Sequence, residues 1–253
     1  MTEVKQEQVT VATTDGRCQV SVFAPDDGAK HPGAIMYTDA FGIRPSSLEM
    51  GRRLASNGYI VLVPDIFYRY GDYGPLNPPE VLASPEGFGR LAPMMASTDT
   101  NRAAQDTRAF LDYLSSREDV AEAGVGVTGY CMGGGLAFTA AGTYPDRIKA
   151  LATFHTSRLI TDNELSPARV AKDIRARVLI AGADHDAGYP PEMAEELDRM
   201  LTDAGVDHTM EIYPEARHGW TQTDVPVYDE AAAERHWTEL VDLFDRTLKP
   251  TAG

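Results

Sequence analysis

Short apolar runs alternate with amphipathic segments along most of this chain of 253 residues. The apolar runs have the length of buried strands, and the segments between them carry apolar residues at helical spacing. The expected strands are 33–37, 59–63, 125–128, 148–154, 177–181 and 208–213, and the expected helices are 46–56, 98–115, 132–143, 191–204 and 227–248. Repeated strand–helix units of this size predict an α/β fold, with a mostly parallel central sheet and helices on both of its faces.

The first 24 residues follow a different pattern, in which apolar and polar residues alternate. The alternating apolar positions are Val9, Val11, Cys18, Val20 and Val22. Asp15-Gly16 lies between the two runs and is typical of a tight turn, so an N-terminal antiparallel hairpin is predicted at one edge of the sheet. On this pattern Cys18 packs as a small hydrophobic residue.

The stretch 71–95 interrupts the strand–helix alternation. It contains five prolines and four glycines. Because a long irregular segment in a compact domain is usually functional, we expect a lid or a pocket wall, and the alternative is a variable surface insertion. The chain has no internal repeat and no dividing linker, so 1–253 is expected to form a single domain.

The charge balance restricts the partners of the protein. With 38 acidic and 23 basic residues, the formal net charge is −15. Nucleic acids and anionic membrane surfaces both need a basic partner, so neither is expected here. The polar N-terminal segment is unlike a signal peptide, and two cysteines are too few for a disulfide framework, which together predict a cytoplasmic protein.

The most specific motif is Gly129-Tyr130-Cys131-Met132-Gly133. It follows an expected strand and opens an expected helix, which is the context of a nucleophile elbow, here with cysteine as the nucleophile. The glycines allow a tight turn that projects the Cys131 side chain above the sheet. The helix N-terminus favours a thiolate there, and the backbone N–H of Met132 is placed to stabilise an oxyanion. A buried structural cysteine is the alternative.

A thiolate nucleophile needs a base, and the base needs an acid that orients it. In an elbow fold these groups follow the nucleophile in the order acid, histidine. Asp184 comes after the expected strand 177–181 and is predicted to be the acid, with Asp186 as the reserve candidate. His218 follows the strand 208–213 and is predicted to be the base.

Neither a metal nor a nucleotide cofactor is expected. The side chains of Asp184, His185 and Asp186 are consecutive and therefore diverge, and no spaced set of histidines and cysteines accompanies them. The glycine pattern at 124–129 matches a dinucleotide fingerprint in letters only, because these residues form the strand itself rather than the turn after it.

Together with these motifs, three further segments carry a resemblance to a known family: Asp39-Ala40-Phe41-Gly42, Pro64-Asp65-Ile66-Phe67-Tyr68-Arg69 and Arg217-His218-Gly219-Trp220. From about residue 5 to residue 248 the sequence resembles the dienelactone hydrolase family of α/β-hydrolases. The resemblance implies a triad of Cys131, His218 and Asp184 that acts on esters or lactones without a cofactor. It also implies an oxyanion hole formed by the backbone N–H groups of Met132 and Ala40.

Two positions depart from the pattern of that family. The family typically has a glutamate at the position of Asp39, where it holds the resting thiol. Its dienelactone enzymes also use two arginines to bind the substrate carboxylate. Arg69 matches one of them, and Gln222 stands at the place of the other. Whether dienelactone itself is a substrate is therefore left open.

The predicted function is hydrolysis of a small ester or lactone, carboxymethylenebutenolidase-like, through a thioester on Cys131. The expected pocket residues are Phe41, Tyr68, Tyr130 and Trp220, with core packing as the alternative for each. Arg69 is expected to hold an anionic group of the substrate or, alternatively, to form a structural ion pair. The partner is a small molecule, and the protein is expected to be a monomer or a small homo-oligomer. The alternatives are another acyl transfer or C–C hydrolysis on the same fold, and a non-catalytic thiol redox sensor or binding module.

Overall fold

The computed structural model describes residues 2–249, in which eight strands form one sheet. The order across the sheet is β1-β2-β4-β3-β5-β6-β7-β8. The strands are β1 (Val4–Thr13), β2 (Gly16–Pro25), β3 (His31–Tyr37), β4 (Ile60–Pro64), β5 (Val120–Tyr130), β6 (Ile148–Phe154), β7 (Arg177–His185) and β8 (His208–Arg217). β1 pairs with β2 and β2 with β4 in antiparallel fashion, and all other neighbours are parallel. The predicted parallel sheet and N-terminal hairpin are confirmed.

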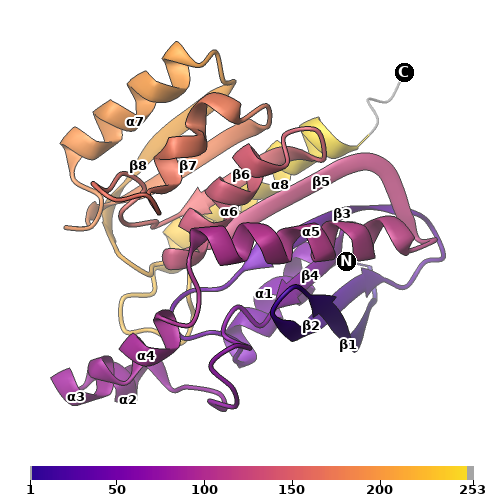
Figure 1. The fold of residues 1–253 in the computed structure, drawn as a ribbon, viewed down its shortest axis with the longest axis horizontal. Helices are drawn as coiled ribbons and strands as arrows, with labels where there is room; N and C mark the ends of the chain where they lie inside the picture. Colours follow the sequence, from indigo (N-terminus) through magenta and orange to yellow (C-terminus); the bar gives the residue numbers. More distant parts are fainter. Residues whose placement is uncertain (1, 250–253) are drawn as a thin grey trace.

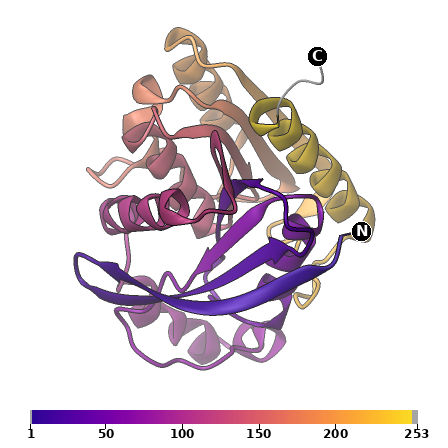
Figure 2. The ribbon, with the colours of Figure 1, turned by 90° about the vertical axis from the view of Figure 1, so that its right-hand side faces the viewer.

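Helices cover both faces of the sheet, as Figure 2 shows for α8 and α5. The helices α1 (Pro45–Ser56) and α8 (Glu230–Leu248) pack on one face, and α5 (Thr100–Ser116) and α6 (Met132–Thr143) pack on the other. A short 3-10 helix at Pro167–Asp173 packs against α6, and α7 (Pro191–Asp203) lies beside β8. Because side chains alternate along a strand, Ile35 of β3 enters one apolar core while Ala34 and Met36 enter the other.

Two strands next to the site are longer than the apolar pattern predicts. β7 continues to His185 and β8 to Arg217, and these two residues pair with each other. The last residues of each strand, Asp184 and His185 in β7 and Arg217 in β8, are polar and exposed, so apolar content gives no signal for the strand ends. As a result, Asp186 and His218 are the first residues beyond the carboxyl ends of their strands.

The proline-rich stretch 71–95 contains the short helices α2 (Pro78–Leu82), α3 (Pro85–Gly89) and α4 (Leu91–Met95). They lie together at one end of the molecule, at the lower left of Figure 1. Tyr73 connects this insertion to the loop after β3, because its hydroxyl donates to Asp65 at 2.9 Å and accepts from the Ile43 N–H at 3.0 Å.

Candidate active site

Cys131 occupies a tight turn between the buried strand β5 and the helix α6. Its φ is +54°, in the left-handed region that non-glycine residues seldom adopt. A Cβ on Gly129 would lie 2.1 Å from the carbonyl oxygen of Gly133, and one on Gly133 would lie 2.3 Å from that of Thr38. Glycine is therefore required on both sides of Cys131, and the strand–turn–helix context expected of a nucleophile elbow is present.

His218 connects a carboxylate to Cys131. Its Nδ1 lies 2.6 Å from Oδ2 of Asp186 and 3.2 Å from Oγ of Ser157, and the imidazole lines the same cavity as the Cys131 side chain. Only 5% of the Asp186 side chain is exposed, and its Oδ1 accepts the backbone N–H of Gly188 at 2.8 Å. Asp186 is thus fixed by several donors and orients the imidazole.

The prediction of Asp184 as the acid is wrong in geometry, and the reserve candidate Asp186 takes its place. Asp184 is exposed, and its Oδ2 accepts the Glu215 N–H at 3.4 Å. It still belongs to β7, whereas Asp186 follows the strand end. An acidic residue does lie just beyond the end of β7, but the apolar pattern predicts a strand that ends before Asp184.

The protonation of His218 follows from its two partners. Burial lowers the pKa of His218, but the Asp186 hydrogen bond and the interaction with Cys131 outweigh burial and raise that pKa to about 10. Burial raises the pKa of Asp186, yet the hydrogen bond from His218 brings it below its ordinary value. At neutral pH the arrangement therefore favours an imidazolium held between a carboxylate and a sulfur atom.

Asp39 does not hold the thiol as the resemblance implied. Its two carboxylate oxygens accept from Nη1 and Nη2 of Arg44 at 2.7 and 2.9 Å, and Oδ1 also accepts the Phe41 N–H at 2.9 Å. Arg44 is 1% exposed and also contacts Asp224 and Gln222. Nothing in the sequence indicates this buried arginine, because a basic residue before a helix is usually a surface residue.

The two expected oxyanion donors border the nucleophile. Met132 is the first residue of α6, so its N–H has no partner within the helix. In the loop after β3, the N–H of Phe41 donates to the Asp39 carboxylate and the N–H of Gly42 donates to the Asp39 carbonyl oxygen. The N–H of Ala40 makes none of the hydrogen bonds found in residues 2–249. Ala40 lines the cavity, and the oxyanion role of the two N–H groups stays a prediction.

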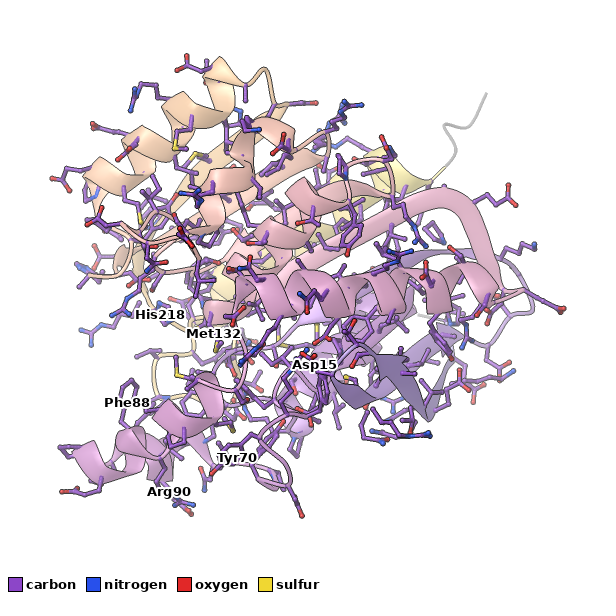
Figure 3. All side chains as sticks on the ribbon, in the orientation of Figure 1. Asp15, Tyr70, Phe88, Arg90, Met132 and His218 are labelled. Carbon is purple, nitrogen blue, oxygen red and sulfur yellow. The ribbon has the colours of Figure 1, made fainter. Side chains whose placement is uncertain are left out.

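A cavity of about 490 Å³ opens over Cys131 and His218. The insertion supplies one wall and the segment after His218 another, and Figure 3 shows how His218 and Phe88 approach it from different elements. The lining residues are Asp39, Ala40, Phe41, Leu82, Phe88, Leu91, Met95, Cys131, His155, Ser157, Asp186, His218, Gly219, Gln222, Val225, Pro226 and Val227. Of the four aromatic residues predicted to line the pocket, Phe41 does so.

The other three aromatic residues are structural. Tyr130 is buried and hydrogen-bonds to His236 at 3.2 Å, and Trp220 is fully buried and stacks on another ring. Tyr68 points to Thr13 and Asp106, away from the cavity.

Arg69 also lies outside the cavity. It forms two hydrogen bonds to Asp106, at 2.7 and 2.8 Å, and a further one to Asp15 at 2.9 Å. The alternative interpretation, a structural ion pair, is the one that the contacts support.

His155 is a cavity residue that the sequence did not assign to the site. It is fully buried, its Nε2 lies 2.8 Å from Oγ1 of Thr221, and its ring lies 5.2 Å from that of His218 in an edge-on arrangement. Burial, followed by the charge of His218, lowers the pKa of His155 well below its ordinary value, so it remains neutral beside the imidazolium.

Within the described part of the chain, one group of side chains could approach a metal ion. The ligand atoms of Asp184, His185 and Glu215 lie within 4.8 Å of one another, and all three residues are exposed. They do not line the cavity.

Among the helices within residues 2–249, none has the length and apolar content needed to cross a membrane.

Comparisons with known proteins identify the family of the chain. The sequence model of the dienelactone hydrolase family matches residues 19–248. A Salmonella typhi protein provisionally named carboxymethylenebutenolidase is 26% identical over 225 residues, which cover 86% of this chain and 78% of that protein. A Methylorubrum extorquens protein with the same provisional name is 26% identical over 241 residues, covering 94% and 79%.

The fold is also found among solved structures. A Klebsiella pneumoniae protein, provisionally named dienelactone hydrolase, superposes with a TM-score of 0.83 at 21% identity, covering 96% of this chain and 99% of that one. At this identity the likeness supports the fold alone, which is the α/β-hydrolase fold that the sequence predicted.

Proposed function

Because the chain belongs to the dienelactone hydrolase family and is a carboxylic ester hydrolase of that kind, we propose that Cys131, His218 and Asp186 hydrolyse an ester or lactone through a thioester. The observation that carries this proposal is the position of His218, which hydrogen-bonds to Asp186 and lines the same cavity as Cys131. A nucleophile, a base and an orienting acid are the minimum set for covalent acyl transfer.

In the first half of the reaction the Cys131 sulfur attacks the carbonyl carbon, and a C–S bond forms. The carbonyl electron pair moves onto the oxygen, which the N–H groups of Ala40 and Met132 stabilise. When the intermediate collapses, the C–O bond to the leaving group breaks, and the His218 imidazolium gives its proton to the departing alkoxide. The products are a thioester on Cys131 and an alcohol.

In the second half His218 is neutral and acts as the base. It removes a proton from a water molecule while the oxygen of that water attacks the thioester carbonyl. The C–S bond then breaks, the carboxylic acid leaves, and the thiolate–imidazolium pair is restored. Asp186 stabilises the charged imidazole at each stage and keeps Nδ1 from competing for the proton.

Asp39 has no part in this cycle as a thiol base. Its pairing with Arg44 occupies both carboxylate oxygens, so we assign the base to His218, which lines the same cavity as Cys131. A cysteine nucleophile has to stay reduced, and Cys18 and Cys131 are both free cysteines, so we propose a reducing compartment such as the cytoplasm.

Two cysteine variants test the proposal. Cys131→Ala is expected to abolish hydrolysis of p-nitrophenyl acetate and of small lactones, whereas Cys18→Ala retains it. Cys18 is a suitable control because it is fully buried and does not line the cavity, and burial raises the pKa of its thiol. Hydrolysis by Cys131→Ala at the wild-type rate would refute the assignment.

A further inference from the structure

The walls of the active-site cavity are apolar on two opposite sides. The insertion contributes Leu82, Phe88, Leu91 and Met95, and the segment after His218 contributes Val225, Pro226 and Val227. Leu91 is buried, whereas 46% of Leu82 and 58% of Phe88 are exposed. Large apolar side chains at a cavity mouth are costly to leave in water, and a bound apolar group covers them.

Among the described residues, the only cation in the cavity lining is the His218 imidazolium, and the Asp186 carboxylate already pairs with it. No lysine or arginine is among the lining residues found in residues 2–249, and Asp39 and Asp186 are the carboxylates there. The nearest buried arginine, Arg44, lies between Asp39 and Asp224, which hold it in structural ion pairs. Although burial lowers the pKa of Arg44, these two carboxylates raise it above its ordinary value, so the charge persists but is already neutralised.

We propose that the cavity selects esters whose acyl group is uncharged and apolar, and discriminates against acyl groups that carry a carboxylate. This inference rests on the proposed hydrolase function and adds its substrate class. A carboxylate in the cavity would lose water without gaining an unpaired cation, because His218 is paired with Asp186, and it would lie near two acidic side chains. An alkyl chain would instead replace water against Leu82, Phe88 and Val227.

The expected selectivity is large enough to measure. Each methylene removed from water contributes about fourfold to kcat/KM while the cavity still has room. We expect kcat/KM to rise from p-nitrophenyl acetate through the butanoate to the hexanoate. The p-nitrophenyl monoester of hexanedioic acid has the same chain length as the hexanoate but ends in a carboxylate, and its kcat/KM is expected to be ~100-fold lower.

Two matched variants test the origin of this selectivity. Phe88→Arg places a cation at the cavity mouth. Tyr70→Arg places the same charge just before the insertion, at a position that is 47% exposed and does not line the cavity. In Phe88→Arg, the ratio of kcat/KM for the hexanoate to kcat/KM for the hexanedioic monoester is expected to fall by about tenfold. Tyr70→Arg is expected to leave the preference within twofold of wild type.

The outcomes separate the two proposals. If the wild-type protein hydrolyses none of these esters, the proposed function fails. If it hydrolyses them through Cys131 but prefers the hexanedioic monoester, or if both arginine variants change the preference equally, the hydrolase function stands and the inferred substrate class is wrong.

Discussion

Replacing the carboxylate of Asp186 by an amide isolates the role of the acid in the triad. The pKa of His218 is raised to about 10 from an ordinary value of 6.5, with Asp186 the largest favourable contribution. That difference corresponds to ~5 kcal/mol in favour of the imidazolium. Because 34% of the His218 side chain is exposed, solvent screening reduces this to roughly half, and Cys131 supplies part of it.

Asp186→Asn is therefore expected to lower the pKa of His218 by about one pH unit and to lower kcat/KM by ~10²–10⁴ through loss of imidazole orientation. The assay follows hydrolysis of ethyl butanoate in a pH-stat, because an alkoxide leaving group needs the imidazolium proton. In the wild type, His218 stays protonated until the pH approaches 10, so activity falls only above that pH. In Asp186→Asn the fall begins at lower pH.

Asp184→Asn is the matched control, since Asp184 is two residues away, exposed and not in contact with His218. It is expected to keep kcat/KM within twofold of wild type, and circular dichroism checks that both variants are folded. The assignment of the acid is refuted if Asp186→Asn retains wild-type activity, or if Asp184→Asn causes the larger loss.

Two further predictions concern the scaffold of the site. Gly133→Ala is expected to lower activity by at least ~100-fold, because its Cβ would lie 2.3 Å from a backbone oxygen. Gly135→Ala is expected to keep most of the activity, because its Cβ would lie 3.2 Å from a proline side chain. Similar kinetics for the two variants would contradict this prediction. Arg44→Met is expected to lower the free energy of unfolding in urea by ~3–5 kcal/mol, because the buried Asp39 carboxylate loses its partner. Arg217→Met, at an exposed position, is expected to lower it by less than ~0.5 kcal/mol. Equal urea midpoints for the two variants would show that the ion pair of Arg44 and Asp39 adds no stability.

The sequence predicts the architecture well because apolar periodicity marks each buried strand and helix. The nucleophile and base are also predicted, since glycines around Cys131 and the strand before His218 are local features. The acid depends on where β7 ends, and the last residues of that strand are polar and exposed, so the pattern stops short and favours Asp184 over Asp186.

The partners of arginines are harder to predict, because an ion pair joins residues that are distant in the chain. Arg69 matches the substrate-binding position of the family, yet its ion pairs with Asp106 and Asp15 hold it outside the cavity. Arg44 shows no signal in the sequence, although it fixes Asp39 beside the cavity. Both outcomes follow from three-dimensional charge pairing, which spacing along the sequence does not encode.

The proposed reaction passes through a thioester on Cys131, and trapping this species is its most decisive test. His218→Asn removes the base that activates water, so an acyl group transferred from p-nitrophenyl hexanoate is expected to accumulate. Intact-protein mass spectrometry should show the added mass of one hexanoyl group, and peptide mapping should locate it on Cys131. An adduct on another residue, or turnover by the wild type with no acyl-enzyme under rapid quench while Cys131→Ala remains active, would contradict the account.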